Sequence, residues 1–311
     1  MQRVVITGGT GLVGKALTKH LSGEGFSITI LTRKMPESAP GNPNVSYALW
    51  DVAQQKIDTT AIKTADYIIH LAGAGIVDKR WTEAYKKEIL LSRTNSSALL
   101  VKSLKEVENS VKAVISASAI GWYGEDPAPL ENGFVETDPA GRGFLGETCK
   151  AWEASISPVS ELGKRLVKLR LGIVLSNDGG AFVEFKNPVK FGMAAILGSG
   201  KQVVSWIHIE DLCRIFSAAI TDARLNGVYN AVAPKPVTNK TFMLTLAEAL
   251  KGKFHIPMHV PSFVLKIMLG ESSIEVLKST TVSSQKISAT GFDFLYPSIE
   301  RAIAQLTGKP I

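Results

Sequence analysis

The sequence predicts an α/β protein: a doubly wound parallel sheet followed by a small C-terminal lobe. Two observations lead to this prediction. Short apolar runs alternate with longer stretches of helical periodicity through the first half of the chain, as expected for parallel strands joined by crossover helices. A glycine-rich turn stands between the first apolar run and the first helical stretch. With 311 residues, of which 45% are hydrophobic and 20% charged, the chain can bury such a sheet between helical layers.

The expected strands are short and rich in Val, Ile and Leu. They are residues 3–6, 27–31, 45–49, 67–71, 113–115 and 167–171. The first expected helix begins at Leu12, where apolar residues recur on one helical face, and Gly23 and Gly25 can end it. Further helices are expected over residues 82–104 and 143–162. This repeated alternation of strand and helix predicts the doubly wound sheet.

The pattern changes after Val174. Residues 176–205 are rich in glycine and turn signals and show no steady alternation. Helical periodicity resumes near Asp211, which we expect to be the N-cap of a helix because its side chain can accept from free N–H groups. Two helical stretches follow in the tail, at 240–250 and 262–269. The expected division is a sheet domain of residues 1–175 and 205–232 and a substrate-side lobe of residues 176–204 and 233–311.

The charge balance bears on the kind of partner. A net charge of +7 and an isoelectric point near 9.3 raise the possibility of a nucleic-acid or membrane partner. The basic residues, however, are spread in pairs such as Lys86-Lys87, without a basic block or an arginine-rich arm. This distribution fits a few cations beside a small anionic ligand, so we expect a small-molecule substrate and neither nucleic acid nor membrane. No apolar run approaches the roughly 20 residues of a membrane span.

The cysteines and the N-terminus indicate the compartment. Cys149 and Cys213 are expected to be small buried hydrophobic residues of a reduced, intracellular protein. No metal site is predicted, because the histidines and cysteines are scattered along the chain. The first strand leads directly into the glycine-rich turn, which leaves no room for a signal peptide. We expect a cytoplasmic protein, and the sequence leaves its oligomeric state open.

The glycine-rich turn, TGGTGLVG, carries the sharpest signal. Gly8 permits the tight turn, Gly11 lets the backbone approach a pyrophosphate, and Gly14 allows close packing of helix on strand. The free N–H groups of the first helical turn, beside Thr10 and Leu12, then face the phosphates of a dinucleotide. The position of this turn between strand and helix predicts a Rossmann-type sheet.

The residues after the second strand indicate which dinucleotide binds. A carboxylate there would hold the ribose hydroxyls of NAD, whereas an arginine accommodates the 2′-phosphate of NADP. Arg33 and Lys34 stand there, nineteen residues after Gly14, and no carboxylate does. We therefore predict NADP(H), with Arg33 on the 2′-phosphate and Lys34 as a second cation; a solvated surface pair is the alternative. Trp50 and Asp51, after the third strand, are candidates for the adenine, although Trp50 also suits the core.

Further motifs continue along most of the chain. They are Leu71-Ala72-Gly73, Arg80-Trp81-Thr82, Ser116-Ala117-Ser118, Tyr123-Gly124, residues 169–175, residues 206–211 and Gly291-Phe292-Asp293-Phe294. With these motifs the chain resembles the short-chain dehydrogenase/reductase superfamily in its extended, epimerase-like form, and more narrowly the NAD-dependent epimerase family with a C-terminal domain of unknown function. The resemblance implies that Leu71, Ala72, Gly73, Ser116 and Ala117 also contact the cofactor. It makes Arg80 a candidate cation near cofactor or substrate, with an exposed loop charge as the alternative.

The resemblance also implies that this chain lacks two catalytic residues of the superfamily. The superfamily uses a Ser or Thr that orients the substrate carbonyl, a Tyr that exchanges the proton, and a Lys four residues later. Ser118 fits the first role. Counting back from Glu153 places Leu145 where the Tyr belongs and Cys149 where the Lys belongs, with Lys150 one residue away. Leucine cannot transfer a proton, so the usual mechanism is absent from this chain.

Three interpretations stay open. In the first, the chain is an NADP-dependent oxidoreductase or epimerase for an unidentified small carbonyl or sugar-type substrate, with Tyr123 or Glu147 as the proton source and Arg80 or Lys150 stabilising an oxyanion. Tyr123 equally suits a packed aromatic, and Glu147 a solvated helix position. In the second, the chain binds NADP(H) without turnover, as a sensor or interaction protein. In the third, bound nucleotide only stabilises a structural protein. His208 is expected to be structural.

Overall fold

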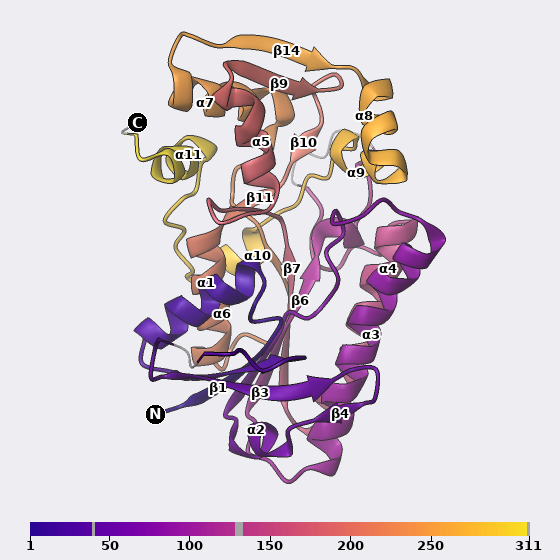
Figure 1. Ribbon diagram of the computed structural model, residues 1–311, viewed down its shortest axis with the longest axis vertical. Helices are drawn as coiled ribbons and strands as arrows, with labels where there is room; N and C mark the ends of the chain where they lie inside the picture. The colour runs from indigo at the N-terminus through magenta and orange to yellow at the C-terminus, as the bar shows by residue number, and fades with distance from the viewer. Residues whose placement is uncertain (39–40, 128–132, 310–311) are drawn as a thin grey trace.

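The chain folds around an eight-stranded sheet with helices on both faces, and a smaller lobe lies at one end (Figure 1). The structure is a computed structural model that describes residues 1–38, 41–127 and 133–309. The strands of the sheet are β1 (Arg3–Thr7), β2 (Ser27–Thr32), β3 (Val45–Asp51), β4 (Lys56–Ile57), β5 (Tyr67–His70), β6 (Ala113–Ala119), β7 (Arg165–Leu171) and β12 (Gly227–Ala231). In the described ranges their order is β12-β7-β6-β5-β1-β2-β3-β4, and only β3 and β4 pair antiparallel. The predicted doubly wound α/β class is confirmed.

Helices cover both faces because the strands are apolar on both faces. The helices are α1 (Leu12–Gly23) and α6 (Ile209–Thr221) on one side and α2 (Thr59–Thr64), α3 (Glu83–Glu106) and the end of α4 (Phe144–Ile156) on the other. In β1, Val4 and Ile6 belong to the core cluster that contains α1 and α6. Val5 belongs to the cluster beneath α2 and α3. Successive side chains of a strand point to opposite faces, so such a strand must be covered twice.

The lobe has a core of its own. Its elements are α5 (Ala181–Lys190), β9 (Met193–Leu197), α7 (Asn239–Lys251), β14 (Ile256–Val260), α8 (Ser262–Leu269), α9 (Ser273–Leu277) and α11 (Ile299–Thr307). β9 and β14 pair in parallel, and Phe182, Ile196 and Phe242 lie in one buried cluster with α11. The remaining short elements are β8 (Ile173–Leu175), β10 (Val203–Val204), β11 (Trp206–His208), β13 (Val237–Thr238), α10 (Gln285–Ser288), and the 3-10 turns Ile120–Trp122, Ser157–Leu162 and Gly270–Ser272.

The expected elements agree with this structure except at their ends. Each of the six expected strands is present, with ends that move by no more than four residues. The helices expected from residues 82, 143, 240 and 262 are α3, α4, α7 and α8. Across the ranges that the structure describes, no helix combines the length and the apolar character needed to cross a membrane.

The structure differs from the sequence expectation in two stretches of the chain. Residues 176–205, expected to be turns, contain α5 and β9, because Phe182 and Val189 supply a buried face for the lobe core. The region around α10 was assigned to the lobe. Its Ile287, together with Phe294 further on, packs in the core beside α6. The chain therefore returns to the sheet before it enters α11.

The cap of α6 was also predicted wrongly. His208 is the N-cap, and its Nδ1 accepts a hydrogen bond from the backbone N–H of Glu210 (3.2 Å). Its Nε2 lies 2.9 Å from Oε1 of Gln305, and burial lowers its pKa, so His208 is a structural histidine here. Asp211 is buried inside the first turn, where its carboxylate accepts from the backbone N–H groups of Leu295 and Tyr296 (2.9 Å each). Asp211 thus fixes the returning chain and does not cap the helix.

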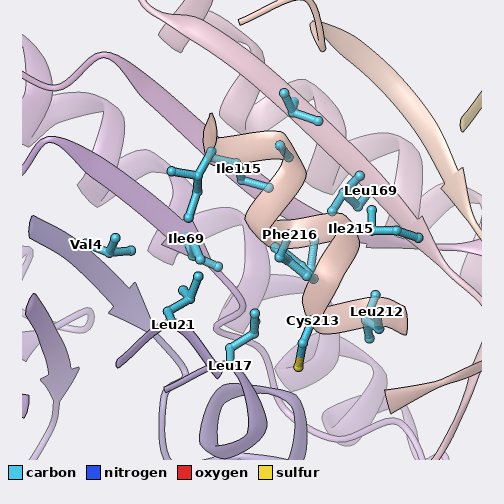
Figure 2. Packing of buried hydrophobic residues seen from close by; sticks show 14 of the residues in the cluster. Val4, Leu17, Leu21, Ile69, Ile115, Leu169, Leu212, Cys213, Ile215 and Phe216 are labelled. Atoms are coloured by element: carbon cyan, nitrogen blue, oxygen red, sulfur yellow. The ribbon is translucent and has the colours of Figure 1, made fainter. Parts of the chain in front are cut away.

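The packing of α6 against α1 sets the position of the glycine-rich turn, because α1 begins directly at that turn. Figure 2 shows Leu17 and Leu21 of α1 in the same cluster as Ile215 and Phe216 of α6. Phe216 is fully buried. Removal of its ring would leave a cavity that neighbouring side chains could fill only by moving.

We expect Phe216→Ala to lower the free energy of unfolding by about 3–5 kcal/mol, because it removes buried area and leaves a cavity. Urea denaturation followed by circular dichroism measures this change. Leu91→Ala on α3, where the side chain is 37% exposed, is the control, and its loss should stay below about 1 kcal/mol. Equal losses at the two positions would contradict the packing described.

Candidate functional site

The glycine-rich turn has the shape that its sequence predicted. Gly8 has a φ of +67°, and a Cβ on it would lie 2.9 Å from the backbone carbon of Leu71. A Cβ on Gly14 would lie 2.3 Å from the carbonyl oxygen of Gly8, so helix and turn touch directly. A Cβ on Gly11, by contrast, would have a single neighbour, that same oxygen, at 3.4 Å. The turn is closed at Gly8 and Gly14 and open on the side of Gly11, where a pyrophosphate could approach.

The N-terminus of α1 is free to bind an anion. Its N-cap is Gly11, which offers no side chain to the first N–H groups, and no acidic residue lies in the first turn. These N–H groups and the positive end of the helix dipole therefore remain for a phosphate. Thr10 is exposed and Leu12 half-buried at this end of the helix. The residues present thus fit the pyrophosphate of a dinucleotide.

A buried hydrogen-bond network holds the neighbouring loop. Thr7 Oγ1 accepts from the backbone N–H groups of Leu71 (3.0 Å) and Ala72 (3.1 Å) and lies 2.8 Å from Nδ1 of His70. Nε2 of His70 lies 3.1 Å from the hydroxyl of Ser97. Complete burial, with a smaller contribution from Arg93, lowers the pKa of His70 to about 3. A neutral His70 therefore anchors the loop beside the turn, and Ser116, buried in β6, is its cross-strand partner.

The residues predicted to contact the adenosine lie in different environments. Arg33 and Lys34 are exposed at the end of β2, where a 2′-phosphate would lie. Asp51 ends β3, and its Oδ1 accepts from the N–H of Gln54 (3.0 Å). Trp50 is wrong as an adenine contact, because its side chain is buried in the core cluster with Ile62 of α2.

One cavity joins the turn to the lobe. It has a volume of about 490 Å³. Leu12 and Val13 line it at the start of α1, Ala117 and Ser118 at the end of β6, and Val276 in the lobe. The cavity thus begins where the phosphates would lie and passes the strand end where ligands bind in such sheets.

The wall formed by α4 carries no proton donor at the expected position. Leu145, Thr148, Cys149 and Trp152 lie on one face of this helix and line the cavity. Leu145 and Cys149 are the residues at the Tyr and Lys positions of the superfamily. Burial raises the pKa of the Cys149 thiol to about 12, so it is neither a thiolate nor a substitute for the lysine charge.

Ser118 belongs to a buried polar cluster behind this wall. Its hydroxyl donates to Oε1 of Glu153 (2.8 Å), and Nε of Arg170 donates to the same oxygen (2.8 Å). Arg170 Nη1 donates to the hydroxyl of Tyr123 (2.9 Å), which in turn donates to Oδ1 of Asn230 (2.6 Å). Arg170 is 2% exposed and Glu153 5%. Ser118 therefore reaches the cavity with its hydroxyl hydrogen already committed to Glu153.

The two proposed proton sources do not lie in the cavity. The lining residues, as far as the chain is described, do not include Tyr123 or Glu147. The hydroxyl of Tyr123 is held by Arg170 and Asn230, and burial raises its pKa to about 12. Glu147 is exposed on another face of α4, as is Lys150. Both catalytic predictions are therefore corrected: Tyr123 is a packed aromatic in a hydrogen-bond network, and Glu147 a solvated helix residue.

Arg80 binds the lobe rather than a cofactor. Its Nη2 donates to the carbonyl oxygens of Ile267 and, at 3.2 Å, Met268, which are among the last carbonyls of α8. Nearby, Nζ of Lys86 lies 2.6 Å from Oε2 of Glu271. These two contacts connect the sheet domain to the lobe beside the cavity, and they correct the cofactor role predicted for Arg80.

The sequence analysis assigned no role to three residues that lie in or directly behind the wall of the cavity. They are Glu153 of α4, Arg170 of β7, and Arg93 of α3, which lines the cavity. The sequence contains a weak signal for Arg170: β7 holds three basic residues, and of these Arg165 and Lys168 are half-buried whereas Arg170 is buried. Nothing local indicated that Glu153 would meet it, because the two lie on different elements.

Comparisons of the sequence agree with this architecture. The NAD dependent epimerase/dehydratase family matches residues 4–143, and a domain of unknown function (DUF1731) matches residues 260–306. An epimerase family protein of Staphylococcus saprophyticus is 36% identical over 308 residues, which cover 98% of this chain and 99% of that protein. An epimerase family protein of Staphylococcus aureus strain MRSA252 is 36% identical over 311 residues, 99% of this chain and 100% of that protein.

Solved structures give the same result. The crystal structure of human epimerase family protein SDR39U1 (isoform 2) with NADPH has a TM-score of 0.86 at 30% identity and covers 99% of each chain. A nucleoside-diphosphate sugar epimerase from Corynebacterium glutamicum has a TM-score of 0.78 at 30% identity, over 99% of this chain and 59% of that one. A UDP-N-acetylglucosamine 4-epimerase from Bacillus cereus has a TM-score of 0.76 at 16% identity, over 99% of this chain and 96% of that one, and shares the fold.

The sheet, the glycine-rich turn and the lobe define an extended short-chain dehydrogenase/reductase fold of the Rossmann type. The chain belongs to the NAD-dependent epimerase/dehydratase family and carries a C-terminal DUF1731 domain. The resemblance stated from the motifs is thereby confirmed.

The ion pair behind the cavity leads to a stability prediction. We expect Glu153→Leu to lower the free energy of unfolding by about 3–5 kcal/mol, because it leaves the buried charge of Arg170 uncompensated. The double variant Glu153→Leu/Arg170→Met should lose less than the single variant, because both charges are gone. Chemical denaturation of wild type, Glu153→Leu, Arg170→Met and the double variant measures this, and a double variant that loses the sum of both single effects would contradict the coupling.

His70 leads to a prediction about pH. Its folded pKa of about 3 lies below the ordinary value of 6.5, so below pH 6.5 the unfolded chain binds a proton that the folded chain does not. Protonation of His70 therefore does not reduce the free energy of unfolding above pH 6.5, and it reduces this free energy progressively as the pH drops from 6.5 toward 3. Between pH 6.5 and 4.5 we expect wild type to lose roughly 2 kcal/mol more than His70→Asn, since one pH unit corresponds to about 1.4 kcal/mol. Parallel acid profiles in urea titrations would refute this.

Proposed function

We propose that the chain binds NADP(H) and acts on a small carbonyl or sugar-type substrate in the cavity between sheet and lobe. The observation that carries the proposal is the continuity of the site. The uncapped N-terminus of α1, the end of β6 and the lobe all line one cavity of about 490 Å³. A cofactor with its pyrophosphate at Gly11 would therefore extend toward Ser118 and the lobe. The human relative crystallised with NADPH supports this choice of cofactor.

The preference for NADP(H) over NAD(H) rests on the end of β2. Arg33 and Lys34 are exposed there, and residues 32–34 contain no carboxylate that would repel a 2′-phosphate. A guanidinium binds a phosphate with two parallel N–H donors. The adenosine ribose of NAD carries no 2′-phosphate and cannot make this contact.

For turnover, the roles of the chain's own residues are limited by their contacts. Bound NADPH would supply a hydride to a carbonyl carbon. Ser118 can accept a hydrogen bond from a ligand, because its own hydrogen is donated to Glu153. The hydroxyl of Thr148 also lines the cavity and stands one residue before Cys149, the position where the superfamily places its lysine.

One observation favours a second candidate, a sensor or interaction protein that binds NADP(H) without turnover. The cavity face of α4 presents Leu145 and the neutral thiol of Cys149 where proton transfer takes place in the superfamily. Neither group exchanges a proton at neutral pH.

Cofactor preference is tested by calorimetric titration with NADPH and NADH. We expect wild type to bind NADPH more tightly, and Arg33→Ala to weaken NADPH by about 10-fold or more while changing NADH by less than about 2-fold, because only NADPH carries the 2′-phosphate. Arg301→Ala, at an exposed position of α11, is the matched control and should change neither. Tighter binding of NADH by wild type would overturn the assignment.

Turnover is tested by following NADPH oxidation against aldehydes, ketones and nucleotide sugars. An enzyme should show activity with at least one class, and Ser118→Ala should lower kcat by about 100-fold, because Ser118 would accept a hydrogen bond from the hydroxyl into which the carbonyl is converted. Tight NADPH binding without turnover across the panel would support the sensor instead.

A further inference from the structure

The substrate side of the cavity is mainly apolar. Ile173, Leu197, Val203 and Val276 line it where the sheet domain meets the lobe, and Phe185 of α5 lies on the same side. Such a surface favours a hydrocarbon portion of a ligand, because burying it removes apolar area from water on both partners.

Charges in the lining are few, and one pair is already neutralised. Among the described residues, the charged groups that line the cavity are Arg93, Lys278 and Glu275. Nζ of Lys278 lies 2.7 Å from one oxygen of Glu275 and 2.9 Å from the other. The lobe side therefore presents a closed ion pair to an incoming ligand, and this leaves Arg93 as the cation of the lining.

Arg93 has neutral partners only. Its Nη1 donates to the carbonyl oxygen of Ile89 (2.9 Å), and its Cζ lies 5.0 Å from the ring centroid of Trp152. Within the described part of the chain it takes part in no ion pair. Burial lowers its pKa, yet an arginine stays charged at neutral pH. A half-buried guanidinium without a counter-ion is a binding site for an anion.

The surroundings hold Arg93 against the wall of the cavity. A Cβ on Gly73 would lie 3.0 Å from its Cζ, so the glycine leaves the room that the guanidinium occupies. On the other side lie Trp152 and Cys149, and Cys149 stands at the position of the missing lysine. A positive charge is therefore present beside that position, supplied by α3 instead of α4. Thr148, whose hydroxyl has no hydrogen bond among the described residues, lies on the same wall.

We infer that the substrate is an apolar molecule with a single carboxylate, which Arg93 binds, and that nucleotide sugars are not substrates. The inference rests on the proposed function and narrows its substrate class. A nucleotide sugar brings a diphosphate with two charges and a polar sugar. The lobe side offers it one ion pair and a mainly apolar surface, on which the amide of Gln202 already donates to the carbonyl oxygens of Leu197 and Val276. A chain of a few methylene groups with one carboxylate matches both the apolar lining and the single cation.

The test compares two probes that differ only in charge, octanoate and octanamide, with UDP-glucose as the third ligand. Each is titrated by calorimetry into wild type saturated with NADPH. We expect octanoate to bind about 10-fold or more tightly than octanamide, because a charge-assisted contact to a guanidinium exceeds a neutral one. UDP-glucose should bind more weakly than octanoate. Equal affinities of the first two probes, no binding of octanoate, or tighter binding of UDP-glucose would each overturn the inference.

Variants then assign the effect to Arg93. Arg93→Met should weaken octanoate by about 10-fold or more, leave octanamide unchanged and change NADPH affinity by less than about 2-fold. Arg93→Lys keeps the charge and should keep part of the preference, and Arg301→Met is the control. A loss of NADPH affinity as large as the loss of octanoate affinity would show that Arg93 serves the cofactor phosphates and would overturn the inference.

Two further measurements distinguish a failure of this inference from misfolding of the variant and from a failure of the proposed function. If Arg93→Met does not fold, as judged by circular dichroism, Arg93→Lys and the wild-type comparison of octanoate with octanamide still decide. If wild type does not bind NADPH, the proposed function fails, and titration of octanoate and octanamide into the cofactor-free protein then tests the cavity by itself.

Discussion

The buried ion pair between Glu153 and Arg170 is the contact on which the site end of the molecule depends. Glu153 lies on α4 and Arg170 on β7, and through them Ser118, Tyr123 and Asn230 join one network that reaches from β6 to β12. Neither charge is stable alone in this environment, because a buried charge without its partner costs several kcal/mol. The strand ends and the wall formed by α4 are therefore held in one arrangement.

This network divides the polar groups into two layers with different tasks. Glu153, Arg170 and Tyr123 lie behind the wall and determine its shape, whereas Ser118 and Arg93 line the cavity itself. The residues that the superfamily uses for proton transfer would belong to the lining, and Leu145 and Cys149 occupy their positions there. The chemistry of the cavity is thus set by a few polar groups on an apolar surface, supported by charges that a ligand does not touch.

The sequence predicted the fold well because the signals are local. Each strand, helix and glycine of the first half is recognised within about ten residues, and the family motifs lie within these short stretches. For the site, the turn has the predicted shape, Arg33 is exposed at the end of β2 and Ser118 lines the cavity, and their contacts with cofactor and substrate stay predictions. Tyr123, Glu147, Arg80 and Trp50 have other roles. Their roles depend on partners far along the chain: Tyr123 meets Asn230 across 107 residues and Arg80 meets Ile267 across 187. No local pattern encodes such pairs. At α6, the sequence predicted Asp211 as the cap, but its carboxylate binds the backbone of Leu295 and Tyr296, far along the chain, and His208 caps the helix.

The contacts of Arg80 and Lys86 with α8 and Glu271 have a consequence for how the junction of sheet and lobe responds to salt. The sheet and the lobe each have a separate apolar core, and these two contacts at their margin are polar and lie near solvent. Exposed pairs of this kind contribute roughly 0–1 kcal/mol each, because water and salt replace them easily. Other contacts also join the two parts, among them the carboxylate of the buried Asp211 with the backbone of Leu295 and Tyr296 and the ring of His208 with Gln305. A rise in ionic strength is therefore expected to loosen the margin beside Arg80 and Lys86 and to leave the rest of the junction in place.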